Sequence, residues 1–287
     1  MFEKQTMPLP DDVFRLLRDF IHGYCGIYFD DGSRFLLERR LSRRIEQHRL
    51  GSFEEYYHYL RYDRKREEEL AVLIDNLTTN ETYFFREAHQ LRAFSEEILP
   101  ELRETLAARK TLRIWSAGCS TGEEPYTIAI LMLESGDWWR DWRVEILGSD
   151  ISQRVLAAAR RGVYKKSAHR ATSPDMLAKY FVPDEKGDFR IIDRVRELVS
   201  FSCLNLLDPY KTSLVSNMDV IFCRNVIIYF DREAKKKVIA SFNDKLRDGG
   251  YLLLGHSESL INLSTAFVLR TLRNDMVYQK PVRMKAP

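Results

Sequence analysis

From residue 111 onward, short apolar segments alternate with longer segments of helical periodicity. Strands are predicted at 112–115, 143–148, 198–203, 219–222 and 251–254, and helices at 123–134, 152–161 and 232–246, the last ended by Gly249 and Gly250. This alternation predicts a parallel sheet covered by helices, an α/β fold. Residues 162–197 do not follow it, because Pro174, Pro183 and Gly187 interrupt them and 188–192 has the pattern of half a hairpin. We therefore expect a small inserted subdomain at about 165–197.

The first 76 residues lack strand-like patterns. Apolar side chains recur at helical spacing from Val13 to Ile21, and Gly23 and Gly26 then interrupt the pattern. A second helix is predicted over 33–50, ending at Gly51, and Ser52 is predicted to cap a third. The chain of 287 residues is long enough for two domains. We predict an all-α domain over 1–76, a linker and connecting helix over 77–110, and the sheet domain over 111–287.

The second predicted helix is strongly basic. Residues 34–50 contain six arginines and two glutamates, which gives a local net charge of 6 − 2 = +4. At about 100° per residue, four of the arginines share one arc of the helix: Arg39, Arg40, Arg43 and Arg44. Arginine suits contacts with carboxylates or phosphates. A solvated helix face is the alternative interpretation.

Composition limits the class of protein. The net charge of 45 − 42 = +3 argues against a nucleic-acid-binding surface along the whole chain. The four cysteines have no metal-site spacing, so we expect no metal site and a reduced, cytoplasmic protein. No signal peptide or stretch of about 18 apolar residues is visible, so no membrane insertion is expected. Without a heptad run we expect a monomer.

Small residues follow the first strand of the sheet domain, in the segment 116–126. They allow close backbone approach to a ligand at the start of the next helix. The segment fits neither G-x-G-x-x-G nor a Walker loop, and the helix begins with Glu123 and Glu124. Two carboxylates would repel a pyrophosphate and attract a cation, although they could also only complement the helix dipole.

The second strand ends at Asp150. An acidic residue at this place commonly binds ribose hydroxyls, and the alternative is a cap for the helix that begins near Ser152. A ligand with a cation and a ribose but no phosphate is S-adenosylmethionine. The loop and Asp150 together therefore indicate this cofactor.

Six segments of the chain carry a family resemblance: 77–87, 117–126, 149–150, 205–207, 221–230 and 255–258. In these segments the chain resembles the CheR-type chemotaxis receptor methyltransferases. The resemblance implies an N-terminal all-α domain, then a Rossmann-like S-adenosylmethionine-dependent methyltransferase domain with a small inserted antiparallel β-subdomain. It also implies a protein-glutamate O-methyltransferase that esterifies methyl-accepting chemotaxis proteins and releases S-adenosyl-L-homocysteine.

The same resemblance implies the site residues. Cofactor-binding roles fall on Asn80, Thr82, Arg86, Ala117, Gly118, Glu124, Asp150, Asn205, Leu206, Arg224 and Asn225. We assign catalytic roles to Arg86 and Tyr229. Alternatively, Asn80 and Thr82 could cap a helix carrying residues 83–94, and Asn205 could be a turn residue. Phe84 and Phe85 are expected in the core, and the roles of His256 and Glu258 are left open.

The resemblance also implies the partner, the cytoplasmic helical bundle of chemoreceptors, on which the basic helix would dock. Some family members bind a C-terminal receptor pentapeptide through a longer glycine-bearing hairpin loop. Here the segment 181–189 is short and has one glycine, so we expect independence from the pentapeptide. Two alternatives stay open. One is a methyltransferase acting on nucleic acid or a small molecule, although 225–229 lacks the prolines of an Asn-Pro-Pro-Tyr-like motif. The other is a non-catalytic, cofactor-bound adaptor.

Overall fold

The computed structural model describes residues 7–282, which divide into two compact units. Residues 7–79 and 229–231 form the first unit, and residues 80–228 and 232–282 form the second. Within the described residues, no helix is both long enough and apolar enough to cross a membrane.

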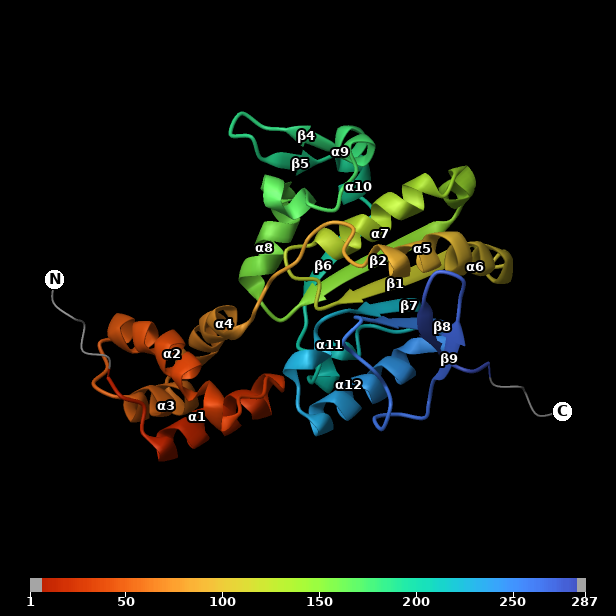
Figure 1. The fold of residues 1–287 in the computed structure, drawn as a ribbon. Helices are drawn as coiled ribbons and strands as arrows, with labels where there is room; N and C mark the ends of the chain where they lie inside the picture. The colour runs from red at the N-terminus through yellow and green to blue at the C-terminus, as the bar shows by residue number, and fades with distance from the viewer. Residues whose placement is uncertain (1–6, 283–287) are drawn as a thin grey trace. The chain divides into compact units, whose positions relative to one another are not determined.

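The first unit is all-α, as predicted (Figure 1). Its helices are α1 (Asp11–Cys25), α2 (Arg34–His48), α3 (Phe53–Tyr62) and α4 (Arg66–Leu77), with a 3-10 turn, η1, at Asp31–Ser33. Each α-helix contributes buried apolar side chains to one core, such as Leu17, Leu41, Leu60 and Leu73. The segment 229–231 joins this unit, since the Tyr28 amide donates to the Tyr229 carbonyl at 3.0 Å.

The helix ends in this unit only partly follow the sequence prediction. Gly26 ends α1 at φ 75°, whereas Gly23 lies inside the helix. The prediction that α2 continues to Leu50 is wrong, because Arg49 adopts a left-handed conformation at φ 56°. The amides of Arg49 and Leu50 then bond to carbonyls of the last helical turn, which ends the helix at His48. The predicted cap of α3 is confirmed, because Ser52 Oγ accepts from the Glu55 amide at 3.1 Å.

A mixed seven-stranded sheet forms the centre of the second unit, in the order β6-β2-β1-β7-β8-β10-β9. Its strands are β1 (Thr111–Ala117), β2 (Arg143–Asp150), β6 (Val199–Cys203), β7 (Met218–Cys223), β8 (Leu246–Leu254), β9 (Val268–Thr271) and β10 (Met276–Gln279). The first five strands of the spatial order are parallel, and β10 runs antiparallel to both of its neighbours, β8 and β9. The order and direction confirm the predicted Rossmann-like fold.

Helices cover both faces of this sheet (Figure 1). The main helices and turns are α5 (Ala88–Ala93), a π-helical turn η2 (Phe94–Ile98), α6 (Leu99–Thr105), α7 (Glu123–Glu134), η3 (Asp137–Asp141), α8 (Gln153–Arg161), α11 (Pro209–Thr212), η5 (Ile227–Tyr229) and α12 (Arg232–Lys245). On one face Leu112 and Ile114 share a core with side chains of α5 to α7. On the other face Trp115 packs edge-on against Phe242 of α12, with ring centroids 5.3 Å apart.

The insertion forms a separate antiparallel sheet in the order β3-β5-β4. Its elements are β3 (Val163–Tyr164), η4 (Lys166–His169), α9 (Pro174–Tyr180), β4 (Phe181–Pro183), β5 (Phe189–Ile191) and α10 (Asp193–Arg196). β3 lies before residue 165, where we expected the insertion to begin, and pairs with β5. The two strands are far apart in sequence, which explains why the local pattern did not mark β3.

Two features near the C-terminus differ from the sequence prediction. Gly249 and Gly250 do not end a helix, because α12 ends at Lys245 and both glycines lie inside β8. A Cβ on Gly250 would lie 2.9 Å from the Arg247 carbonyl oxygen and 3.0 Å from that of Asp219, so close backbone approach requires this glycine. The hairpin of β9 and β10 was not predicted, since each strand has only four residues.

Candidate functional site

The loop between β1 and α7 turns sharply at the carboxyl end of the sheet. Gly118 and Gly122 adopt positive φ values of 82° and 93°. The amides of Gly118 and Cys119 both donate to the Ser149 carbonyl, at 2.7 and 2.8 Å, which ties the loop to the end of β2. A Cβ on Gly118 would lie 2.4 Å from Val226 Cγ2, so the segment after β7 packs directly on this loop. Ala117, the last residue of β1, is buried.

Asp150, at the end of β2, is held by backbone amides. Its carboxylate accepts from Ser120 N at 2.8 Å and from Ser152 N at 2.9 Å, and only 8% of the residue is exposed. The cap of α8 is Ser152, whose Oγ accepts from the Val155 amide. The alternative interpretation of Asp150 as the helix cap is therefore wrong, and its carboxylate is fixed at the junction of the first two strand ends.

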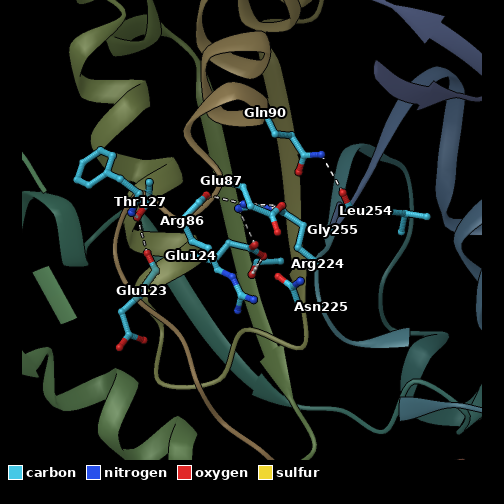
Figure 2. A network of polar contacts seen from close by, with 12 residues as sticks. Arg86, Glu87, Gln90, Glu123, Glu124, Thr127, Arg224, Asn225, Leu254 and Gly255 are labelled. Carbon is cyan, nitrogen blue, oxygen red and sulfur yellow. Dashed lines mark hydrogen bonds and ion pairs between the residues drawn. The ribbon is translucent and has the colours of Figure 1, made fainter. Parts of the chain in front are cut away.

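The two glutamates that begin α7 point in different directions (Figure 2). Glu124 accepts from Ser116 Oγ at 2.7 Å and from Arg224 Nη1 at 3.2 Å. Glu123 accepts from Thr121 Oγ1 at 2.6 Å. Burial raises the pKa of both carboxyl groups, and Arg224 and Ser116 oppose that rise at Glu124. The expectation that the two attract one ligand cation needs correction, because their carboxylates face different partners, and only Glu124 stays a predicted cofactor-binding residue.

That cation, Arg224, is the centre of the polar network in Figure 2. Its side chain is 3% exposed and pairs with Glu87 at 3.1 Å as well as with Glu124. Its Nη2 also donates to the Arg86 carbonyl. Two carboxylates around one guanidinium give a formal charge of −1, which suits a cationic ligand. Glu87 and Ser116 were not predicted as site residues, because no local pattern relates Glu87 to Arg224, 137 positions away, or Ser116 to Glu124 across the loop.

The linker approaches the same loop without forming the helix considered above. Phe85 and Glu87 both have φ 58°, and α5 begins only at Ala88. Asn80 and Thr82 therefore do not cap a helix that carries residues 83–94. Phe84 is fully buried against aromatic rings of the insertion, and Phe85 packs partly buried against the same core, as expected.

Asn80 and Thr82 instead line a pocket of about 400 Å³ together with Thr121, Glu123 and Tyr164. Ser120 Oγ donates to the Asn80 carbonyl at 3.3 Å, so the linker also contacts the glycine loop, residues 118–122 between β1 and α7. The pocket extends the carboxyl end of the sheet towards the insertion.

Asn225 and Asn205 complete the set of predicted residues in this unit. Asn225 lies at φ 60°, and its Oδ1 is buried without a hydrogen-bond partner among the described residues. Asn205 Oδ1 accepts from the Leu207 amide at 3.1 Å, which confirms the turn interpretation, and Leu206 is half-buried beside it. The Leu204 amide donates to the Asp150 carbonyl, which brings this turn to the end of β2. Cofactor contacts of these residues stay predictions.

Glu258, whose role the sequence left open, accepts hydrogen bonds from four backbone amides. The donors are Asn225 at 2.8 Å, Val226 at 2.9 Å, Ile228 at 3.3 Å and Gly255 at 2.7 Å. His256 is exposed, and its Nε2 lies 3.6 Å from Asp275. Glu258 thus organises the segment that carries Arg224 and Asn225.

The remaining candidates belong to the first unit. Tyr229 is 38% exposed, and its carbonyl accepts from Tyr28. Arg44 pairs with the buried Glu69, which also accepts from Tyr56 Oη at 2.5 Å, and Arg40 donates to the Leu77 carbonyl. Arg39 and Arg43 are exposed, and among residues 7–282 neither forms an ion pair. The four arginines are therefore not equivalent.

Two models of one protein family match the chain, one in each unit. The family model described as "CheR methyltransferase, all-alpha domain" matches residues 12–78, and "CheR methyltransferase, SAM binding domain" matches residues 80–275. The chain is similar to chemotaxis protein methyltransferase 2 of Vibrio cholerae, with 37% identity over 278 residues, 97% of this chain and 96% of the relative. It is also similar to the chemotaxis protein methyltransferase of Borreliella burgdorferi, with 36% identity over 253 residues, 87% and 88% of the two chains.

One solved structure resembles the chain distantly. Magnesium protoporphyrin IX methyltransferase from Synechocystis, solved with bound S-adenosylmethionine, covers 95% of this chain and 98% of its own at 13% identity. The TM-score of this match is 0.36.

Proposed function

The chain belongs to the CheR methyltransferase family, and we propose that it transfers methyl groups from S-adenosylmethionine to glutamate side chains of chemoreceptors. One observation carries the proposal: both domains of the family match in order, over 12–78 and 80–275. The acidic site around Arg224 lies inside the second match. The products would be a glutamate methyl ester on the receptor and S-adenosylhomocysteine, formed on the cytoplasmic side of the membrane.

The residues at the ends of β1, β2 and β7 suit this cofactor. The Asp150 carboxylate is fixed at the place where an acidic residue commonly binds ribose hydroxyls. The buried Asn225 Oδ1, unpartnered among the described residues, could accept from an ammonium group, and Glu87 with Glu124 supplies an excess negative charge. The turn at Asn205 and Leu206 would border the adenine, and Asn80, Thr82 and Arg86 would close the linker side.

The cofactor supplies an electrophilic methyl group bound to a sulfonium sulfur. A glutamate side chain, with an ordinary pKa near ~4.3, is already an anion at pH 7, so the chain needs no general base. Asp150, Asn225 and Glu124 would hold the cofactor so that its methyl group could pass to the carboxylate oxygen, which would leave the sulfur as a neutral thioether. The chain's task is to hold the carboxylate in line with that bond and to exclude water.

Arg86 is our candidate for orienting a carboxylate, either that of the substrate or that of the cofactor. It is half-buried, its Nη1 donates to the Glu81 carbonyl at 3.1 Å, and its guanidinium lies 5.8 Å from the centre of the Tyr83 ring. A guanidinium has five N–H donors, so this contact leaves capacity for a carboxylate. We assign Tyr229 the hydrogen bond to the reacting oxygen as our own hypothesis, because its phenol is a hydrogen-bond donor.

The test is methylation of receptor-containing membranes with cofactor labelled in the methyl group. We expect label on the receptor that is released by base, because carboxyl methyl esters hydrolyse in base. An Asp150→Ala variant is the matched negative control. Base-stable label, or label on added nucleic acid, would refute glutamate esterification. A chain that binds cofactor but labels nothing would support the adaptor alternative.

Receptor docking is the second part of the proposal. Phe35, Arg39 and Arg43 follow one another at four-residue spacing on α2, and all three are exposed, Phe35 at 70%. Arg40 and Arg44 have partners inside the first unit. We therefore assign the contact with the acidic receptor bundle to the exposed stripe of Phe35, Arg39 and Arg43. Opposite charges across such a contact accelerate association and weaken with salt.

Charge reversal tests the stripe. The variant Arg39→Glu/Arg43→Glu should raise the KM for receptor and leave the Kd for S-adenosylhomocysteine unchanged. Arg64→Glu/Lys65→Glu changes the net charge equally, between α3 and α4, and should leave both constants near wild type. Equal effects of the two variants on KM would mean that overall charge, and not the stripe, matters. Unchanged receptor kinetics in both would leave α2 as a solvated face.

A further inference from the structure

The segment after β7 carries two of the proposed cofactor-binding residues in an unusual backbone conformation. Arg224 is 7% exposed, and Asn225 has φ 60°, a left-handed conformation that asparagine tolerates better than most residues. Such a conformation persists only where surrounding contacts hold it. The contacts that hold it identify residues on which the site depends.

The principal contact is the carboxylate of Glu258. One of its oxygens accepts from the amides of Asn225 and Gly255, and the other from those of Val226 and Ile228. Burial raises the pKa of this carboxyl group, and the backbone hydrogen bonds oppose the rise. Hydrogen bonds to a charged acceptor are stronger than those to a neutral one. Three of them hold residues 225–228, and the fourth, from Gly255, ties the carboxylate to the residue after β8.

The neighbouring Gly255 shows how closely the two segments approach. A Cβ at this position would lie 2.9 Å from Asn225 N and 2.9 Å from Glu258 Oε2. Real Cβ atoms do not come this close to backbone nitrogen, so only glycine fits. Because β7 and β8 are parallel neighbours, their ends at Cys223 and Leu254 lie side by side, which brings residues 225 and 255 together.

Residues 224–228, which Glu258 holds, contact the glycine loop on their other side. Val226 packs on Gly118, at a distance that would not admit a Cβ. Arg224 extends to Glu87 and Glu124, and Gln90 Nε2 of α5 donates to the Leu254 carbonyl at 2.8 Å (Figure 2). A shift of the segment would therefore move a guanidinium, a buried amide oxygen and the wall of the glycine loop together.

We propose that Glu258 is a positioning residue, which holds residues 224–228 so that Arg224 and Asn225 face the cofactor. It acts through backbone amides and does not itself contact the ligand. This inference depends on the proposed function, because it takes Arg224 and Asn225 as cofactor-binding residues.

Glu97 offers a matched control for this role. Its carboxylate also accepts from two backbone amides, Arg273 N at 2.7 Å and Asn274 N at 3.0 Å, in the turn between β9 and β10. Glu97→Gln and Glu258→Gln therefore make the same chemical change to the same kind of contact. Only the second contact holds the segment that carries Arg224 and Asn225.

The experiment measures the Kd for S-adenosylhomocysteine by calorimetry and the Tm of each variant without ligand. Because hydrogen bonds to a charged group are lost, we expect Glu258→Gln to raise the Kd about tenfold or more. We expect Glu97→Gln to lower the Tm while its Kd stays within about twofold of wild type. Gly255→Ala displaces the same amides while keeping the carboxylate, and it should also raise the Kd.

The outcomes separate this inference from the proposed function. If both glutamine variants lose stability but bind S-adenosylhomocysteine like wild type, Glu258 is only structural and the inference is wrong. If Glu258→Gln does not fold, Gly255→Ala decides, and its unchanged Kd would overturn the inference. Failure of the wild-type chain to bind S-adenosylhomocysteine would instead refute the proposed cofactor, and the inference with it.

Discussion

His169 is expected to make the stability of the second unit depend on pH. Its ring is 7% exposed and stacks on Phe84 at a centroid distance of 5.0 Å, with Phe181 and Phe189 edge-on at 4.6 and 5.1 Å. Neither ring nitrogen has a hydrogen-bond partner among the described residues. Burial lowers the pKa of His169 from 6.5 to about 4, since the imidazolium cannot be solvated there.

The sign and size follow from proton linkage. The unfolded chain binds this proton near pH 6.5 and the folded chain near pH 4. The contribution of neutral His169 to the free energy of unfolding is therefore fully present above pH 6.5 and is lost as the pH falls towards 4. The full change in the free energy of unfolding is (6.5 − 4) × ~1.36, about 3 kcal/mol, of which about 2 kcal/mol is lost by pH 5. The four tryptophans (Trp115, Trp138, Trp139 and Trp142) all lie in the second unit, so their fluorescence reports its unfolding.

The assay is urea unfolding at pH 7.5 and pH 5, followed by tryptophan fluorescence, for wild type, His169→Phe and His89→Gln. His169→Phe should lose about 2 kcal/mol less than wild type between the two pH values, because phenylalanine keeps the ring packing and cannot bind a proton. His89 is exposed on α5, and its variant should follow wild type. Parallel losses in wild type and His169→Phe would refute the reasoning.

Three further predictions concern the first unit, the site and the insertion. Burial would raise the pKa of Glu69, but hydrogen bonds from Arg44, Tyr56 and His48 lower it overall. Glu69→Gln should therefore lower the free energy of unfolding of the first unit by about 3 kcal/mol, measured by denaturation followed by far-ultraviolet circular dichroism, and by less at acidic pH, where wild type loses the carboxylate. An unchanged midpoint at pH 7 would contradict this prediction. Arg86→Ala and Tyr229→Phe should slow receptor methylation, Tyr229→Phe with intact S-adenosylhomocysteine binding; near-normal rates would remove these residues from the mechanism. Titration with a receptor C-terminal pentapeptide should give no specific binding, because residues 184–188 form a tight turn closed by Asp184, which accepts from Lys186 N and Asp188 N; saturable binding would overturn this expectation.

Much of the fold could be predicted because the relevant signals are local. α7 was predicted with its observed bounds, since the apolar pattern and the acidic first turn lie within the helix itself. The glycine loop follows β1 and Asp150 ends β2, and the two could be expected to lie close together because parallel strands have their carboxyl ends at one edge of the sheet. At two places the prediction failed because a residue other than glycine, Arg49 or Glu87, has a left-handed conformation.

The sequence by itself determined the two kinds of architecture, the family and some of the residues that gather at the carboxyl edge of the sheet, such as Glu124, Asp150 and Arg224. Tertiary structure alone decided which of these residues pair with one another: Arg224 with Glu87, 137 positions away, and Glu258 with the amides after β7. It also divided the basic helix into arginines that stabilise the first unit and arginines that face solvent. The physical reason is that periodicity and capping act within a few residues, whereas buried charges must find partners wherever the folded chain brings them.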